Sequence, residues 1–337
     1  TSLDGLDICY SKFIKTKSTW DFQILTSETI PYSSEWEHAL KNAIQLPSEE
    51  LLKLDVDYGF YLGEKTSEFI SKHKIINLDL IASHGHTVFH QPKNKFTLQI
   101  GDGRAIKSKT NKTVIYDFRS QDVILGGNGA PLVPIGDELL FSNFDACLNL
   151  GGFSNISLKR NKIRIAFDIC PVNILLNSFA EKLGKKFDDN GDLARTGLID
   201  YELLDQLNQL KFYQEKAPKS LGIEWINEQV LPLIKTQKTE DLLATFTEHA
   251  ATQIANIFDF YNIQNVLITG GGAYNSYLIE KIKSRTETEI QIPKKEIIEY
   301  KEALIFAFMG VLRSLNINNV LSSATGSQND HCSGLVC

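Results

Sequence analysis

The chain has 337 residues, of which 42% are hydrophobic and 23% are charged, and its formal net charge is −6 at pH 7. This length predicts two domains, each large enough to bury a core. The acidic balance excludes the general phosphate attraction on which nucleic-acid binding depends, so we expect no nucleic-acid partner.

The five cysteines are scattered and lack the spacing of a zinc site, so we interpret them as reduced thiols: Cys9, Cys147, Cys170, Cys332 and Cys337. No stretch approaches the ~18 apolar residues of a membrane span, and the first residues do not resemble a signal peptide. We therefore expect a cytoplasmic protein without a membrane partner.

Hydrophobic periodicity predicts the elements of the first half, namely strands over 6–13 and 22–29 and helices over 36–46 and 59–71. Three further apolar runs end in glycine, histidine, aspartate or arginine: 78–85, 97–103 and 113–119. Polar residues at strand ends are what an open α/β sheet offers to ligands, although glycine and aspartate are also ordinary turn residues.

From residue 146 the pattern starts again, with strands over 147–158, 162–169 and 265–269 and helices over 172–183, 201–210, 241–261 and from 275 onward. Both halves begin with small polar or glycine residues beside a strand. This parallel predicts a duplicated domain with one phosphate-binding hairpin in each half.

Two glycine turns lie at the ends of strand-like runs, Gly151-Gly152 in NLGGFSNIS and Gly270-Gly271-Gly272 in LITGGGAYN. Glycine leaves no Cβ in the way of a ligand and allows backbone N–H groups to converge on a phosphate. The turns therefore favour a nucleotide site, and an ordinary hairpin is the alternative for either one taken alone.

Motifs along the whole chain resemble those of the anhydro-N-acetylmuramic acid kinases: TSLDGLD, SHGHTVFHQP, LQIGDG, DFRSQD, GGNGAPLVP, NLGGFSNIS, FDICPVN, PKSLG, TGGGAYN and EALIFAFMG. The resemblance implies an α/β fold of the sugar kinase, Hsp70 and actin type, with mixed sheets flanked by helices and an ATP cleft between two domains. The expected substrate-side domain is 1–140, completed by 302–337, and the expected nucleotide-side domain is 141–301. We also expect a homodimer.

The implied reaction uses ATP and water to open 1,6-anhydro-N-acetylmuramic acid and to phosphorylate O6, which yields N-acetylmuramic acid 6-phosphate and ADP in peptidoglycan recycling. Asp168 in FDICPVN matches the family's catalytic aspartate and would be the general base toward water. Without the resemblance, an N-cap of the helix that follows is the alternative role for Asp168.

For the sugar, the resemblance and charge point to Arg119, Glu302 and His84. The alternative for Arg119 is a surface salt bridge, and the alternative for Glu302 is a first-turn glutamate that the helix dipole favours without any function. The expected ATP-binding residues are Thr1, Ser2, Leu3, Asp4, Gly5, Leu6, Asp7, Gly151, Gly152, Gly270, Gly271 and Gly272. Asp4 and Asp7 would hold Mg²⁺ with ATP, directly or through water, and Asp102 is a further candidate. We interpret His84, His86 and His90 as loop histidines with protein partners rather than as a metal site.

The chain departs from the family pattern at Ile169, Cys170 and Val172, where threonine and two glycines are usual, and at Leu221, where threonine is usual. Family members also carry a strand before TSLDG, so we expect about ten more residues before Thr1. Two other functions stay open, a kinase of the same superfamily for another sugar and an ATP-gated binding module without enzymatic activity.

Overall fold

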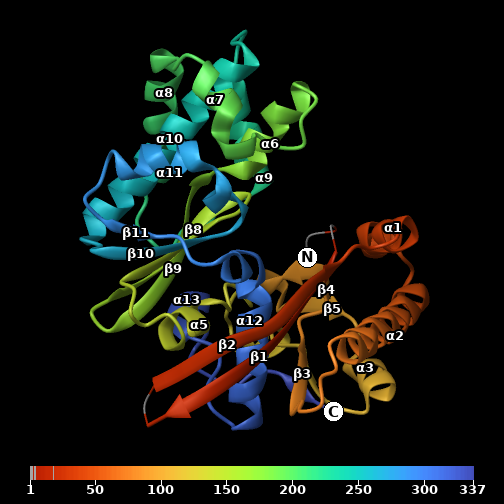
Figure 1. The fold of residues 1–337 in the computed structure, drawn as a ribbon. Coiled ribbons are helices and arrows are strands. Elements are labelled where there is room, and N and C mark those ends of the chain that lie inside the picture. Colours follow the sequence, from red (N-terminus) through yellow and green to blue (C-terminus); the bar gives the residue numbers. More distant parts are fainter. Residues whose placement is uncertain (1–2, 4, 18) are drawn as a thin grey trace. The chain divides into compact units, whose positions relative to one another are not determined.

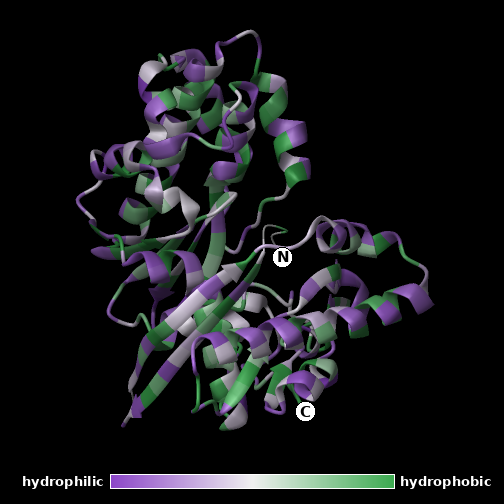
Figure 2. Ribbon diagram, turned by 45° about the vertical axis from the view of Figure 1, so that its right-hand side comes forward, coloured by the Kyte–Doolittle hydropathy of each residue, from purple (hydrophilic) through white to green (hydrophobic). Residues whose placement is uncertain are grey.

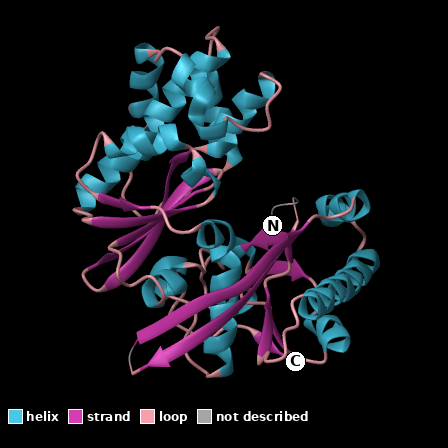
Figure 3. Ribbon diagram, viewed as in Figure 1, coloured by secondary structure: helices cyan, strands magenta, loops and turns pink. Residues whose placement is uncertain are grey.

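The computed structural model describes residue 3, residues 5–17 and residues 19–337. Thr1, Ser2 and Asp4 of the predicted nucleotide set therefore lie outside the described residues. The chain divides into two compact units: unit 1 comprises Thr1–Leu140 and Tyr300–Cys337, and unit 2 comprises Phe141–Glu299. Each unit contains both strands and helices (Figure 3), which confirms the predicted α/β class.

The described part of unit 1 contains three small sheets and the helices beside them. Its strands are β1 (Leu6–Thr16), β2 (Thr19–Ile30), β3 (Leu80–Ser83), β4 (His86–Gln91), β5 (Phe96–Ile100), β6 (Thr113–Tyr116) and β12 (Leu335–Val336). Its helices are α1 (Ser34–Asn42), α2 (Ser48–Lys72), α3 (Gly103–Thr110), α4 (Ser120–Ile124), α5 (Pro134–Leu139) and α13 (Ser322–Thr325). Helix α12 (Lys295–Ser314) begins in unit 2 and ends in unit 1.

The β1–β2 hairpin is long (Figure 1), and its antiparallel register runs from Leu6 opposite Ile30 to Thr16 opposite Thr19. A separate sheet has the order β12-β6-β3, in which β3 is parallel to β6 and β12 is antiparallel to it. Strands β4 and β5 form another antiparallel pair. The parallel β3–β6 pair matters for the site, because the residues that follow both strands emerge at the same edge.

Helix α2 is nearly twice as long as the predicted helix over 59–71, because it begins at Ser48 and Gly59 lies inside it rather than at its start. A Cβ at Gly59 would lie 2.6 Å from the Asp102 carbonyl oxygen, and a Cβ at Gly63 would lie 2.8 Å from the Lys109 Cβ. These two glycines therefore allow α3 to pack closely against α2. Along the helices, hydrophilic and hydrophobic residues alternate (Figure 2), as is typical of helices that cover a core on one face.

Unit 2 contains one five-stranded mixed sheet with the order β11-β10-β7-β8-β9. The strands are β7 (Ala146–Leu150), β8 (Phe153–Arg160), β9 (Ile163–Pro171), β10 (Asn265–Thr269) and β11 (Glu289–Gln291). The helices are α6 (Asn173–Lys182), α7 (Asp192–Thr196), α8 (Tyr201–Asn208), α9 (Ile223–Trp225), α10 (Thr239–Tyr261) and α11 (Ser276–Lys283). Helix α10 is mostly buried and contributes Leu243, Ala251, Ile254 and Phe258 to the core.

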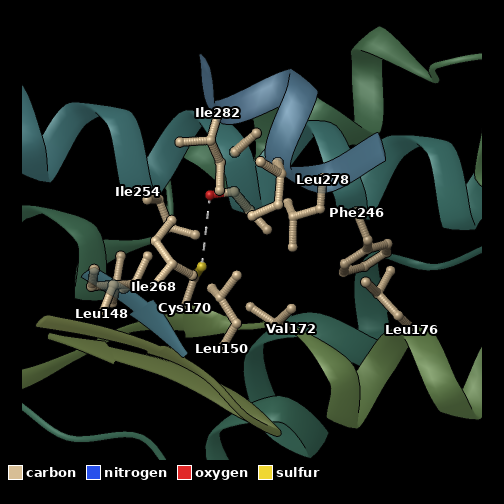
Figure 4. Packing of buried hydrophobic residues seen from close by; sticks show 14 of the residues in the cluster. Leu148, Leu150, Cys170, Val172, Leu176, Phe246, Ile254, Ile268, Leu278 and Ile282 are labelled. Atoms are coloured by element: carbon tan, nitrogen blue, oxygen red, sulfur yellow. Dashed lines mark hydrogen bonds between the residues drawn. The ribbon is translucent and has the colours of Figure 1, made fainter. Parts of the chain in front are cut away.

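Within that core, the side chains of Cys170 and Val172 pack among aliphatic residues from the sheet and from α10 and α11 (Figure 4). Both side chains are at most 1% exposed. The sheet of unit 2 has no counterpart of the same order among the described residues of unit 1, where the strands lie in two- and three-stranded sheets. The predicted duplication is therefore not seen in this part of the chain.

Among the described residues, no helix is both long enough and apolar enough to cross a membrane.

Candidate functional site

Asp168 lies near the end of β9, where the pairing with β8 is irregular. Asn155 of β8 faces Asp168 and the adjacent Ser154 faces Cys170, so Ile169 is an extra residue in β9. This bulge allows Ile169 and Cys170 to be buried in succession, whereas Asp168 remains half-buried. The bulge thus leaves the Asp168 carboxylate partly exposed, although the next two residues lie in the core.

The loop at residues 218–222 holds the Asp168 carboxylate. Leu221 N donates to Asp168 Oδ2 at 2.8 Å, and Asp168 N donates to the Lys219 carbonyl oxygen at 3.0 Å. Burial raises the pKa of Asp168, and the hydrogen bond from Leu221 opposes this shift. A carboxylate with a raised pKa and one oxygen, Oδ1, without a hydrogen bond from the described residues can accept a proton from water.

The alternative role of Asp168 as a helix N-cap is wrong. The N-cap of α6 is Val172, and no side chain caps this helix. The carboxylate of Asp168 accepts its hydrogen bond from Leu221 N instead.

Ile169, Cys170 and Val172, which differ from the residues usual in the family, have their side chains in the core of unit 2 and not in the candidate site. Burial raises the pKa of the Cys170 thiol to about 12, and Cys170 forms a contact of 3.2 Å with the Ser154 hydroxyl. A thiol with such a pKa is inert as a nucleophile at neutral pH. Leu221, the other departure, contributes its backbone N–H to Asp168, a contact that does not depend on the side chain.

The two predicted glycine turns come together in unit 2. Gly151 and Gly152 join β7 to β8, and Gly270 follows β10, the parallel neighbour of β7. A Cβ at Gly270 would lie 2.5 Å from Asn149 Oδ1, and one at Gly272 would lie 2.7 Å from the Leu150 Cβ. These contacts show that the second turn is in close contact with the residues that precede the first.

The five glycines differ in backbone conformation and in the space around them. Only Gly270 has a positive φ, of 83°. Gly152 and Gly271 are exposed, and the nearest atoms to a Cβ there would be 3.6 and 3.8 Å away. Open space at these two positions is consistent with a surface that a ligand approaches closely.

Asn173 is a site residue that the sequence did not single out. It is the first residue of α6, its Nδ2 donates to the Leu150 carbonyl oxygen at 3.0 Å, and its backbone N donates to the Gly151 carbonyl oxygen at 3.2 Å. The same Nδ2 is the nearest atom to a Cβ at Gly271. Asn173 therefore connects both glycine turns to the start of a helix. Its position five residues after Asp168 was the available signal.

In unit 1, His84 and Arg119 meet at the edge predicted from the strand ends. His84 follows β3 and Arg119 follows β6, and the two strands end with Ser83 opposite Tyr116. Arg119 Nε donates to His84 Nε2 at 2.8 Å. The His84 imidazole must then be neutral, with its proton on Nδ1, which donates to the Gly85 carbonyl oxygen at 3.0 Å. Burial and the Arg119 charge lower the pKa of His84 to about 3.

Arg119 is more than a surface ion pair, because it is held by neutral acceptors. Nη1 donates to the Gly129 carbonyl oxygen, and the guanidinium carbon lies 5.9 Å from the centroid of the Phe306 ring. Burial lowers the pKa of Arg119, and the nearby Glu302 carboxylate is the largest opposing influence. The structure thus brings His84, Arg119 and Glu302, the three predicted sugar-binding residues, into one cluster in unit 1.

A cavity of about 630 Å³ in unit 1 is lined by His84, Glu302 and Phe306, together with residues 5–13 and 77–83. Consecutive residues of β1 and β3 line it, which means that the edges of these strands face it. Mostly apolar residues of α2 and α12 also line it. The cluster of His84, Arg119 and Glu302, rather than the volume of this cavity, therefore indicates a sugar site.

The described part of the first motif opens the β1–β2 hairpin. Leu3 lies in a turn, Gly5 precedes β1, and Leu6 and Asp7 are its first residues. Thr29 Oγ1 donates to Oδ1 of the exposed Asp7 at 2.6 Å. The oxygen atoms of this carboxylate are donors of the kind that Mg²⁺ prefers.

Asp102 has a structural role. Its Oδ1 accepts from Arg104 N at 2.7 Å as the N-cap of α3, and Arg104 also pairs with the carboxylate through its guanidinium. These hydrogen bonds lower the pKa of Asp102. The two remaining histidines belong to β4 and not to a loop, and His90 Nδ1 forms a hydrogen bond of 3.2 Å with the Thr97 hydroxyl.

Comparison with known proteins places the chain. A family described as anhydro-N-acetylmuramic acid kinase matches residues 1–337. The chain belongs to this family. A protein of Haemophilus influenzae named anhydro-N-acetylmuramic acid kinase is 33% identical over 97% of this chain and 93% of its own length. One of the same name from Francisella tularensis subsp. novicida is 30% identical over 97% of this chain and 94% of its own length.

Among solved structures, the hexokinase of the ROK family from Thermus thermophilus is 9% identical, with a TM-score of 0.40, and the match covers 91% of this chain and 100% of that chain. Membership in the anhydro-N-acetylmuramic acid kinase family confirms the predicted enzyme class, a phosphotransferase, and with it the use of ATP.

Proposed function

We propose that this chain opens 1,6-anhydro-N-acetylmuramic acid with water and transfers the γ-phosphoryl group of ATP to O6, giving N-acetylmuramic acid 6-phosphate and ADP in cytoplasmic peptidoglycan recycling. Family membership supports the reaction. The observation that carries the mechanism is Asp168, a half-buried carboxylate with a raised pKa that is held by one backbone N–H and does not cap a helix.

In this mechanism, Asp168 Oδ1 accepts the proton from the water that attacks the anomeric carbon. As the new C1–O bond forms, the C1–O6 bond breaks, and O6 takes the phosphoryl group instead of a proton. Leu221 N keeps the carboxylate oriented through Oδ2. Partial burial raises the affinity of the carboxylate for a proton, which favours the transfer from water at neutral pH.

The glycine turns of unit 2 would hold the nucleotide, so that unit 2 is the nucleotide-side domain. Gly151, Gly152, Gly270, Gly271 and Gly272 are grouped around Asn173, and the exposed Gly152 and Gly271 leave room where side chains would stand. Backbone N–H groups at such turns, together with the start of α6, suit phosphate oxygens.

Magnesium would come with ATP and neutralise phosphate charge. Asp7 fits this role, because it is an exposed carboxylate at the start of β1 that Thr29 orients. We include Thr1, Ser2, Leu3, Asp4, Gly5 and Leu6 in the nucleotide set on the resemblance alone.

The cluster in unit 1 would bind the sugar, so that unit 1 is the substrate-side domain. Arg119 uses Nε and Nη1 for His84 and Gly129, and Nη2 has no partner among the described residues. A guanidinium with one nitrogen left for a ligand suits the lactyl carboxylate of the substrate. Glu302 is exposed and could accept hydrogen bonds from sugar hydroxyls.

The test is ADP release with 1,6-anhydro-N-acetylmuramic acid, with the product identified by mass and the Asp168→Asn variant as a control for contaminating ATPases. We expect stoichiometric ADP and N-acetylmuramic acid 6-phosphate. ADP release with a different sugar, and none with this one, would refute the proposal in favour of another sugar kinase. We further propose a homodimer, which sedimentation equilibrium would test.

A further inference from the structure

The orientation of the Arg119 guanidinium depends on a loop whose own residues do not fix its conformation. One of its two acceptors is the carbonyl oxygen of Gly129, in a glycine-rich loop over 126–131. Gly129 has a φ of 68°, a conformation that glycine adopts readily. Something else in the fold must therefore fix this loop.

The buried carboxylate of Asp122 performs that task. Its side chain is 0% exposed, and its Oδ2 accepts from Gly129 N at 2.7 Å. Its Oδ1 accepts from the Thr325 hydroxyl at 2.7 Å. Gly127 N donates to the Asp122 carbonyl oxygen at 2.8 Å, and Asn128 N donates to the Thr325 carbonyl oxygen at 2.8 Å. Gly127, Asn128 and Gly129 are thus each held by a hydrogen bond to Asp122 or Thr325. Asp122 and Thr325 lie 203 residues apart in the chain.

The loop is shaped to this anchor. A Cβ at Gly127 would lie 2.2 Å from Asp122 Oδ2, so the loop can approach the carboxylate only because glycine stands there. A buried carboxylate is costly unless it is compensated by hydrogen bonds and by opposite charge. Gly129 and Thr325 supply hydrogen bonds, and Arg119 is close enough for its charge to interact with that of Asp122.

We propose that Asp122 and Thr325 are positioning residues for substrate recognition: they fix the Gly129 carbonyl oxygen and, through it, hold the Arg119 guanidinium with Nη2 directed to the carboxylate of the substrate. This inference rests on the proposed function, since it assigns the carboxylate of the anhydro sugar to Arg119. It adds two residues that do not touch the substrate and act only through Arg119.

The test compares two sugars, 1,6-anhydro-N-acetylmuramic acid and 1,6-anhydro-N-acetylglucosamine, which lacks the lactyl carboxylate. Thr325→Val has the shape of threonine and removes the hydrogen bond to Asp122. We expect it to raise KM for the sugar with the carboxylate about tenfold, which is the scale of one hydrogen bond to a charged group. KM for the other sugar and for ATP, and kcat for both sugars, should stay within about twofold.

Two further variants separate positioning from stability. Thr325→Ser keeps the hydroxyl and should restore the parent KM. Asp330→Asn is the matched control, because Asp330 Oδ1 accepts its hydrogen bonds among the described residues from Ser322, at the start of the same helix α13. We expect parent kinetics from Asp330→Asn. If Thr325→Val does not fold, Asp122→Asn is judged by the same selective change in KM.

An equal rise in KM for both sugars, or no rise for either, would overturn the inference while leaving the proposed function intact. A parent enzyme that does not distinguish the two sugars would also overturn it. A parent enzyme that releases no ADP with the carboxylate sugar would instead refute the proposed function itself.

Discussion

Replacing Asp168 by asparagine should abolish most of the turnover without disturbing the fold. Asparagine keeps the size of the side chain, and its Oδ1 can accept the hydrogen bond that Leu221 N donates at 2.8 Å. It cannot accept a proton from water. We therefore expect kcat to fall by at least ~10²-fold, a barrier increase of about 2.7 kcal/mol, while the affinities for sugar and ATP survive.

The raised pKa of Asp168 adds a stability test with a defined sign. A carboxyl whose pKa is higher in the folded state stabilises the fold only at low pH, and this contribution is lost as pH rises from its ordinary value, 3.8, through the raised value. At pH 7 the ionised, partly buried Asp168 therefore lowers the free energy of unfolding. Asp168→Asn should be as stable as the parent protein at pH 7 or more stable, and this advantage should vanish toward pH 3.

The assays are steady-state ADP release and denaturant unfolding at both pH values. Asp259→Asn is the matched control, because Asp259 lies near the exposed end of α10 and its carboxylate accepts a hydrogen bond from the Thr286 hydroxyl at 3.1 Å, so parent kinetics are expected. A kcat within a few fold of the parent value for Asp168→Asn would falsify the assignment of the base. Marked destabilisation of that variant at pH 7 would show instead that Asp168 has a structural role.

Three further substitutions test other parts of the reasoning. Gly271→Val should weaken ATP binding at an unchanged melting temperature, whereas Gly270→Val should also destabilise, because φ is 83° there and the new Cβ would lie 2.5 Å from a side-chain oxygen; calorimetry with unchanged ATP affinity for Gly271→Val would contradict the nucleotide site. Arg119→Lys loses the fork that orients a carboxylate, so KM for the anhydro sugar should rise about tenfold or more with a smaller change in kcat, and an unchanged KM would count against that contact. Lys301→Met leaves the buried Asp137 carboxylate without its partner at 2.7 Å and should lower the free energy of unfolding by about 3–5 kcal/mol, most of which Asp137→Leu in the same chain should restore; a loss below about 1 kcal/mol in urea unfolding would refute this.

Hydrophobic periodicity predicted the elements that bury one regular face. The strand over 162–169 and the helix over 241–261 correspond closely to β9 and α10. It missed the first half of α2, because Gly59 is required by the contact with α3, and single-sequence reasoning treats glycine as a helix breaker. Such a requirement depends on a partner element that lies about 40 residues further along the chain.

The sequence predicted those parts of the candidate site in which polar side chains follow the ends of strands. His84 and Arg119 meet because β3 and β6 are parallel neighbours, which the strand-end pattern anticipated. The roles of Asp122 and Asn173 were not predicted, because each acts through backbone groups of a distant loop or turn. The alternative N-cap role of Asp168 failed because α6 begins only at Asn173 and a bulge, which leaves no periodic signal, lies between them.

The bulge at Ile169 limits how this segment can vary. Since Ile169 and Cys170 face the interior in succession, a change at either position alters the volume available to Ala250 and Ile254 of α10 rather than the surroundings of the Asp168 carboxylate. Introducing glycine at Cys170, the residue usual in the family, would leave a void between the sheet and α10. We therefore expect substitutions at Ile169 and Cys170 to be accepted only together with compensating substitutions in α10. The residue types next to Asp168 would then vary with the packing of that helix and not with the chemistry of the site.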